Sequence, residues 1–150
     1  MFRINALINQ KLLEFSTVSP DFKALSFFQH MTEAPEGIYE ISITESLVII
    51  TTQYMTQTDS AVTEYTTYTN NINAYDRDGN HLWNISDIIG GDITYVGAVL
   101  STKEIMKNYY GFDGQLYDDS CELLNCAAEY DRLYIIDLNR RKLRQVLITK

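Results

Sequence analysis

The chain has 150 residues, of which 45% are apolar, and this is enough for one packed core and argues against general disorder. Its formal net charge of −8 argues against binding to nucleic acid or anionic membranes, because both would repel it. No apolar run approaches the roughly 20 residues of a membrane span, and the N-terminus lacks a secretory signal pattern, so we expect one cytoplasmic domain over residues 1–150.

The N-terminal segment, residues 1–36, is expected to contain a helix. Its first part, "INALINQKLLEF", fits either a helix or a strand. In "SPDFKALSFFQHM", Ser19 can cap a helix and Pro20 can take the first helical position, where its missing N–H costs nothing. Large apolar residues then recur at helical spacing: Phe22, Leu25, Phe28 and Met31. The pattern predicts a helix from about 20 to 31.

Residues 37–90 show the alternation that is typical of β-strands. "IYEISIT" alternates apolar and polar residues, and "LVIITTQY" is a continuous apolar run that indicates a central strand. "INAYD" and "HLWNIS" flank "RDGN", in which Asp78 and Gly79 predict a tight hairpin turn. We expect an antiparallel four-stranded meander, with the Thr-rich insertion at 55–70 forming either a hairpin arm or a mobile loop.

Residues 91–150 repeat this plan. Strands are predicted for four segments: "DITYVGAVL", "CELLNCAAEY", "RLYIIDL" and "KLRQVLIT". The insertion of this half falls at 101–120. Ser101 and Glu104 have the spacing of a capping box, which predicts a short helix at about 102–109.

The last hairpins of the two halves align, which explains why one short chain repeats the same pattern. Asp76 matches Asp137 and Leu82 matches Leu143, both at an offset of 61. Repeats of this size are typical of sheet units that need a neighbour to bury their faces. The predicted fold is therefore mostly β, with two antiparallel four-stranded meanders, an N-terminal helix and one short inserted helix.

The segments "INAYDRDGNHLW" and "LYIIDLNRRKL" resemble the outer hairpins of β-propeller blades of the pyrroloquinoline-quinone-like type. The second segment departs from that pattern, since Arg144 stands where the first has Trp83, and Arg140 where it has Gly79. Ring closure takes about 4–8 blades, so the resemblance implies blade-like sheets and not a full propeller. It carries no cofactor over, because no cofactor-ligand motif matches. The alternative is that any hairpin with an aspartate before its turn has this pattern.

The sequence contains no motif that names a reaction. His30 and His81 have no partner at metal-ligand spacing, and Cys121 and Cys126 are not spaced as CxxC. A cytoplasmic chain would keep both thiols reduced. Nucleophile-elbow, phosphate-loop and dinucleotide-binding motifs are absent from the sequence. We therefore expect no catalytic residue, no metal and no cofactor, and a protein that is not an enzyme.

The segment "NYYGFDGQLYDDSCE", residues 108–122, is the main candidate binding surface because it combines aromatic and acidic side chains. Tyrosine is enriched at the centres of interfaces, and acids attract a basic partner. The candidate partner-binding residues are Tyr109, Tyr110, Phe112, Asp113, Tyr117, Asp118 and Asp119. Under the alternative interpretation, the aromatic residues fold back and cap the sheet. Residues 56–70, in the insertion of the first half, are a second candidate surface.

Two functions fit these observations. The first is a small acidic protein-binding module, such as an intracellular inhibitor or immunity-type protein that blocks a basic partner. The second is a self-assembling, propeller-like scaffold in which several copies form a homo-oligomer that binds a ligand. An enzyme that uses scattered carboxylates has the least support.

Overall fold

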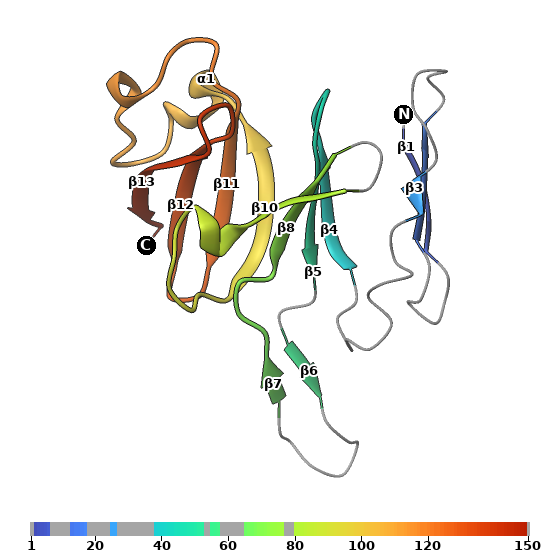
Figure 1. The fold of residues 1–150 in the computed structure, drawn as a ribbon. Coiled ribbons are helices and arrows are strands. Elements are labelled where there is room, and N and C mark those ends of the chain that lie inside the picture. Colours follow the sequence, from blue (N-terminus) through green and yellow to red (C-terminus); the bar gives the residue numbers. More distant parts are fainter. Residues whose placement is uncertain are drawn as a thin grey trace.

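The computed structural model shows a mostly β fold, drawn in Figure 1. The described residues are 2–6, 13–17, 25–26, 38–52, 55–57, 65–76 and 80–149. Within them, the two largest units are antiparallel sheets of four strands each. The predicted pair of meanders is therefore confirmed, and neither sheet closes into a ring.

The first sheet has the strand order β4-β5-β8-β9 and contains the strands predicted between residues 37 and 90. Its strands are β4 (Ile38–Ile43), β5 (Val48–Thr52), β8 (Ile72–Tyr75) and β9 (His81–Asn84). All five residues of β5 are buried, as its apolar run predicts for a central strand. After β9 the chain makes a 3-10 turn, η2 (Ile85–Asp87), whose capping residue is Asn84.

The second sheet has the strand order β10-β11-β12-β13 and contains the strands predicted between residues 91 and 150. Its strands are β10 (Tyr95–Ser101), β11 (Leu123–Ala128), β12 (Arg132–Asp137) and β13 (Lys142–Ile148). Between β10 and β11 lies an insertion with one helical turn, α1 (Lys103–Met106), and a 3-10 turn, η3 (Gly114–Leu116). One edge of this sheet is β10 and the other is β13.

The inserted helix is shorter than predicted and starts one residue later. Thr102 is its N-cap, and the Thr102 hydroxyl accepts a hydrogen bond from the Ile105 amide at 3.2 Å. Ser101, the predicted cap, is instead the last residue of β10 and pairs with Leu123. Strand pairing thus holds Ser101 in the ladder and leaves the cap to the next residue that can accept a hydrogen bond.

No N-terminal helix is shown among the described residues. The helix predicted from 20 to 31 lies mostly outside them, and the two residues described there form a strand, β3 (Leu25–Ser26). This strand pairs with β2 (Leu13–Thr17), which pairs in turn with β1 (Phe2–Ala6). At β3, pairing with a neighbouring strand has overridden the local helical spacing.

The insertion of the first half contains a two-stranded antiparallel arm. Its strands are β6 (Met55–Gln57) and β7 (Tyr65–Thr67), and Figure 1 shows them projecting beyond the first sheet. Of the two alternatives for this insertion, the hairpin arm is the one that these strands support. The predicted turn at Asp78 and Gly79 lies outside the described residues.

The main core lies between the two four-stranded sheets, and both sheets contribute to it. From the first half come Ile49, Ile72, Ala74, Trp83 and Ile85. From the second half come Tyr95, Ala98, Leu124, Cys126, Ala128, Tyr134, Ile136 and Leu138. Burial of these side chains is the main force that holds the sheets together, since full burial of a large side chain such as isoleucine or leucine contributes about 1.5–3 kcal/mol.

Polar side chains of the first sheet cover the β10 edge of the second sheet. The Asn71 side chain accepts from the Tyr95 amide at 2.9 Å and donates to the Tyr95 carbonyl at 2.8 Å. Glu40 accepts from the Ala98 amide at 3.0 Å, and Ser42 donates to the Ala98 carbonyl at 2.8 Å. These side chains therefore take the place of a neighbouring strand along β10.

The repeated aspartate has the same task in both halves. Asp76 accepts a hydrogen bond from the Asn80 amide at 2.9 Å, across the turn between β8 and β9. Asp137 accepts one from the Arg140 amide at 3.2 Å, in the turn between β12 and β13. An aspartate that ends one strand can satisfy a donor of the following turn, and this accounts for the aligned positions.

Candidate protein-binding surface

The insertion at residues 102–121 covers the outer face of the second sheet, which is the face turned away from the first sheet. Met106, Tyr117 and Cys121 of the insertion are buried there against the sheet. Their neighbours in this second core are Leu123, Leu133, Ile135 and Leu147. The second sheet is thus buried on both faces, once by the first sheet and once by its own insertion.

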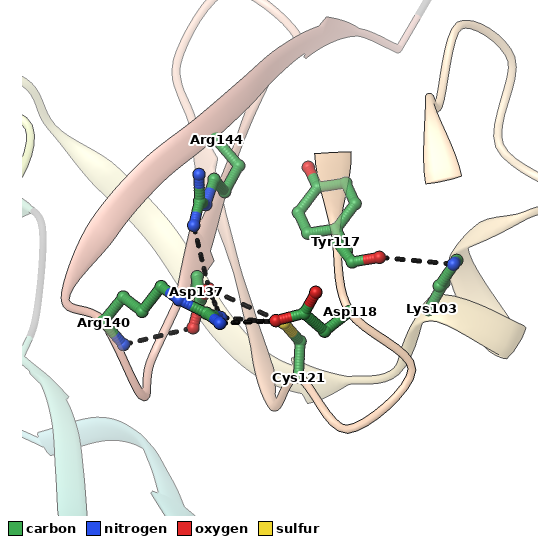
Figure 2. A network of polar contacts seen from close by, with 7 residues as sticks. All are labelled: Lys103, Tyr117, Asp118, Cys121, Asp137, Arg140 and Arg144. Carbon is green, nitrogen blue, oxygen red and sulfur yellow. Dashed lines mark hydrogen bonds and ion pairs between the residues drawn. The ribbon is translucent and has the colours of Figure 1, made fainter. Parts of the chain in front are cut away.

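A polar network fastens the end of the insertion to the hairpin between β12 and β13 (Figure 2). The Asp137 carboxylate is fully buried and accepts a hydrogen bond from Arg140 Nη1 at 2.9 Å. Arg140 also forms an ion pair with Asp118 of the insertion, through its other terminal nitrogen. Arg144 Nη2 lies 3.4 Å from Asp137 Oδ2, and the Cys121 thiol lies 3.6 Å from the same oxygen.

The hydrogen bonds of this network keep the buried Asp137 carboxylate in its ionised form. Burial by itself raises the pKa of Asp137, but hydrogen bonds from Arg140, Cys121 and Arg144 outweigh burial and leave that pKa below its usual value. Hydrogen bonds to Asp137 and Asp118 raise the pKa of Arg140. Both side chains therefore stay ionised around neutral pH, and the charged Arg140 is the group that pairs with Asp118 of the insertion.

A second set of contacts holds the middle of the insertion against β13. The Gln145 side chain donates to the Gly111 carbonyl and accepts from the Asp113 amide at 3.1 Å. Phe112 stacks on Tyr117 with ring centroids 5.0 Å apart. Gly111 has a φ of +82°, a backbone conformation that glycine adopts at little cost. This segment is thus fixed by its own contacts on the sheet.

The structure separates the seven predicted binding residues into two groups. Tyr117 is only 4% exposed, because it belongs to the core beneath the insertion, and burial raises its pKa to about 12. Phe112 is half-buried against it. These two aromatic residues fold back and cap the sheet, which was the alternative interpretation of the segment.

The other five predicted residues lie at the surface. Tyr110 is 97% exposed and Tyr109 is 45% exposed. Asp113 is exposed and caps η3. Asp118 is paired with Arg140, and Asp119 forms an ion pair with Lys103 at 3.1 Å. The aromatic part of the candidate surface is therefore reduced to two adjacent tyrosines.

A groove runs between these two tyrosines and the end of β13. It has a volume of about 430 Å³ and is lined by Tyr109, Tyr110, Leu147, Ile148 and Thr149. Ile148 is 58% exposed and Val146, two residues before it, is 42% exposed. Sequence reasoning did not single out this part of β13. The available signal was its position, since the last strand of a meander forms an edge of the sheet.

Two further openings border the insertion. One, of about 410 Å³, is lined by residues that include Lys103, Glu104, Lys107 and Asp119. The other, of about 300 Å³, lies where β10 ends and is lined in part by Ile43, Leu100, Ile105 and Glu122.

Over the described part of the chain, no cluster of three or more histidine, cysteine, aspartate or glutamate side chains has an arrangement suited to a metal ion. None of the helices described is both long and apolar enough to cross a membrane. No protein-family model matches the sequence, and no curated protein matches it. The likeness to propeller blades therefore extends to two unclosed four-stranded antiparallel sheets, and no family match supports kinship with blades of the pyrroloquinoline-quinone-like type.

Proposed function

We propose that this chain is a small protein-binding module without catalytic activity, working in the cytoplasm as an inhibitor or immunity-type protein. The observation that carries the proposal is the position of Tyr110. Its side chain is 97% exposed and stands beside an apolar groove that includes Leu147 and Ile148. Exposed apolar groups that line one concavity are typical of sites where another protein docks.

The support beneath Tyr110 favours binding over a role in folding. The next residue, Gly111, is hydrogen-bonded to Gln145, and Phe112 stacks on the buried Tyr117. The tyrosine is thus presented on an anchored backbone while its own side chain makes little contact with the protein. An aromatic side chain on a fixed backbone loses little conformational entropy when a partner covers it.

Charge supports a partner that is basic overall. The chain carries 20 acidic and 12 basic residues, and its net charge of −8 attracts a positively charged protein over long distances. Asp113, three residues after Tyr110, is exposed and forms no ion pair within the part of the chain that the structure describes. We propose that such acids increase the rate of association, while the apolar groove supplies most of the affinity.

The covered outer face of the second sheet weighs against the self-assembling scaffold. In a propeller, each sheet stacks on a further sheet, whereas here residues 102–121 occupy that face. A further sheet could stack there only if Tyr117 and Met106 left their core. We expect a mass in solution of one chain, about 17.3 kDa, by light scattering. A mass that corresponds to several copies would instead support the self-assembling scaffold.

Affinity capture from the native cell lysate, followed by mass spectrometry, tests the proposal. We expect one stoichiometric partner with wild-type bait and loss of that partner with Tyr110→Ala. The matched control is Leu82→Ala, which removes a 38% exposed apolar side chain from β9 of the first sheet. Equal capture by wild type, Tyr110→Ala and Leu82→Ala, with all three folded, would contradict the proposed surface.

A further inference from the structure

We propose that the partner binds by adding one extended segment to the free edge of β13, and this inference rests on the proposed function. The segment would carry apolar side chains at alternate positions and acidic residues at the end that lies beside Lys142. Strand addition of this kind obtains affinity from main-chain hydrogen bonds and specificity from the side chains on either side of the edge.

The hydrogen-bond pattern shows which backbone groups of β13 face away from the sheet. The Thr149 amide donates to the Asp131 carbonyl at 2.8 Å, and the register places these residues opposite each other. In an antiparallel pair, hydrogen-bonded and non-hydrogen-bonded positions alternate. The N–H and C=O groups of Val146 and Ile148 therefore point away from β12. No other backbone among the described residues pairs with them.

The two edges of the second sheet differ in whether other residues cover their outward-facing backbone groups. On β10, both backbone groups of Tyr95 are bound by Asn71, and both of Ala98 are bound by Glu40 and Ser42. Proteins usually cover an edge in this way, because an uncovered edge pairs with other chains. The contrast indicates that the open edge at β13 is available for a strand from outside.

The side chains around the open edge select an apolar segment. Ile148 is 58% exposed and lines the groove together with Leu147, Tyr109 and Tyr110. A strand paired with β13 would place every second side chain on the face where the two tyrosines stand. Valine or isoleucine at those positions would fill the groove.

The charges near β13 indicate which end of the incoming segment is acidic. They also argue against a second copy of this chain as the binding partner. Arg141 and Lys142, at the start of β13, are exposed and form no ion pair within the described part of the chain. Acidic residues of the incoming segment would pair with them. Two copies of this chain would each bring a net charge of −8 and would repel one another.

The test uses fluorescence anisotropy with a labelled synthetic peptide of about eight residues, the length of a typical strand. In this probe, valine and threonine alternate behind two glutamates. One control peptide has two lysines in place of the glutamates. A second control carries N-methyl groups on alternate peptide bonds, which removes the donors that pairing needs and leaves the protein unaltered.

Two variants of Val146 separate pairing at the edge from side-chain contact. Val146→Pro removes an N–H that points away from β12 and leaves the ladder to β12 in place. Val146→Thr keeps the backbone donor and nearly the same shape. Urea unfolding confirms that each variant is folded, and the N-methylated peptide tests the same point if Val146→Pro does not fold.

We expect the glutamate peptide to bind the wild type and Val146→Thr alike, and to bind Val146→Pro at least tenfold more weakly. Relative to the glutamate peptide, the N-methylated peptide should bind the wild type at least tenfold more weakly, and the lysine peptide about threefold to tenfold more weakly. The inference would be overturned if the N-methylated peptide bound as tightly as the glutamate peptide, or if no peptide bound. It would also be overturned by a wild-type chain that is a dimer in solution and becomes a monomer as Val146→Pro, because a second copy would then occupy the edge.

The lysate capture distinguishes failure of this inference from failure of the proposed function. A partner that is lost with Tyr110→Ala but fully retained with folded Val146→Pro would leave the binding module standing and exclude strand addition. A partner lost with both variants and retained with Val146→Thr would support both proposals.

Discussion

The carboxylate of Glu40 lies 3.0 Å from the point where a Cβ atom on Gly97 would stand. Glu40 comes from β4 of the first sheet and Gly97 from β10 of the second. The missing side chain gives Glu40 room to accept its hydrogen bond from the Ala98 amide. A glycine that sequence reasoning treated as an ordinary strand residue therefore sets how one sheet binds the edge of the other.

This relationship predicts a non-additive pair of substitutions. Gly97→Ala should displace the Glu40 carboxylate and leave the Ala98 amide without its acceptor, at a cost of about 1–2 kcal/mol in the free energy of unfolding. In a Glu40→Ala background the same change should cost nothing, because the acceptor is already gone. Urea unfolding of the four proteins of the cycle measures the coupling. Additive effects would show that Gly97 acts through something other than Glu40.

The buried Asn71 side chain makes a second link between the sheets, and its loss should be severe. Asn71→Ala would remove hydrogen bonds to both backbone groups of Tyr95 and to the Thr52 carbonyl. We expect a loss of about 2–4 kcal/mol, because unsatisfied buried groups cost about 1–3 kcal/mol each and part of that cost is relieved by relaxation. Urea midpoints are compared with Asn108→Ala, which alters an exposed asparagine and should change little. Equal midpoints for the two variants would contradict this role.

Asp137 predicts a dependence of stability on acid pH. Its pKa is lowered in the folded protein, since hydrogen bonds from Arg140 and its neighbours outweigh the effect of burial. The stabilisation is therefore fully present above the unfolded-state pKa of about 4 and is lost as the pH falls through the lower folded-state pKa. Asp137→Asn should destabilise the protein by about 1–3 kcal/mol at pH 7, and the difference from wild type should shrink towards pH 3.

Urea midpoints of wild type and Asp137→Asn between pH 7 and pH 3 check this sign. Asp92→Asn alters an exposed carboxylate and serves as the control. A difference between wild type and Asp137→Asn that grows as the pH falls would show that the carboxylate is not held ionised by Arg140.

The two cysteines should be inert towards thiol reagents while the protein is folded. Cys126 is fully buried in the core between the sheets, and burial raises the pKa of its thiol. Cys121, at the end of the insertion, is buried against the second sheet. Only the thiolate reacts, so iodoacetamide should label neither cysteine at pH 7.5 and both in urea, counted by mass spectrometry. Fast labelling of Cys126 under native conditions would mean that the two sheets separate readily.

The sequence by itself was sufficient to predict the strands of both meanders. Alternation in "IYEISIT", the buried run "LVIITTQY" and the aligned pair Asp76 and Asp137 are local patterns, and strand period and turn chemistry depend on neighbours in the chain. Tyr109 and Tyr110, which the sequence places in a predicted binding surface, are exposed in the structure.

Only the tertiary structure decided which parts of that segment are buried and which edge remains open. Tyr117 is as aromatic as Tyr110, but it lies over Leu133 and Ile135, which the chain brings beneath it from β12. The cover on β10 likewise depends on how the sheets pack. Such contacts join residues far apart in sequence, and no local pattern records them because they are selected by the burial of the whole core.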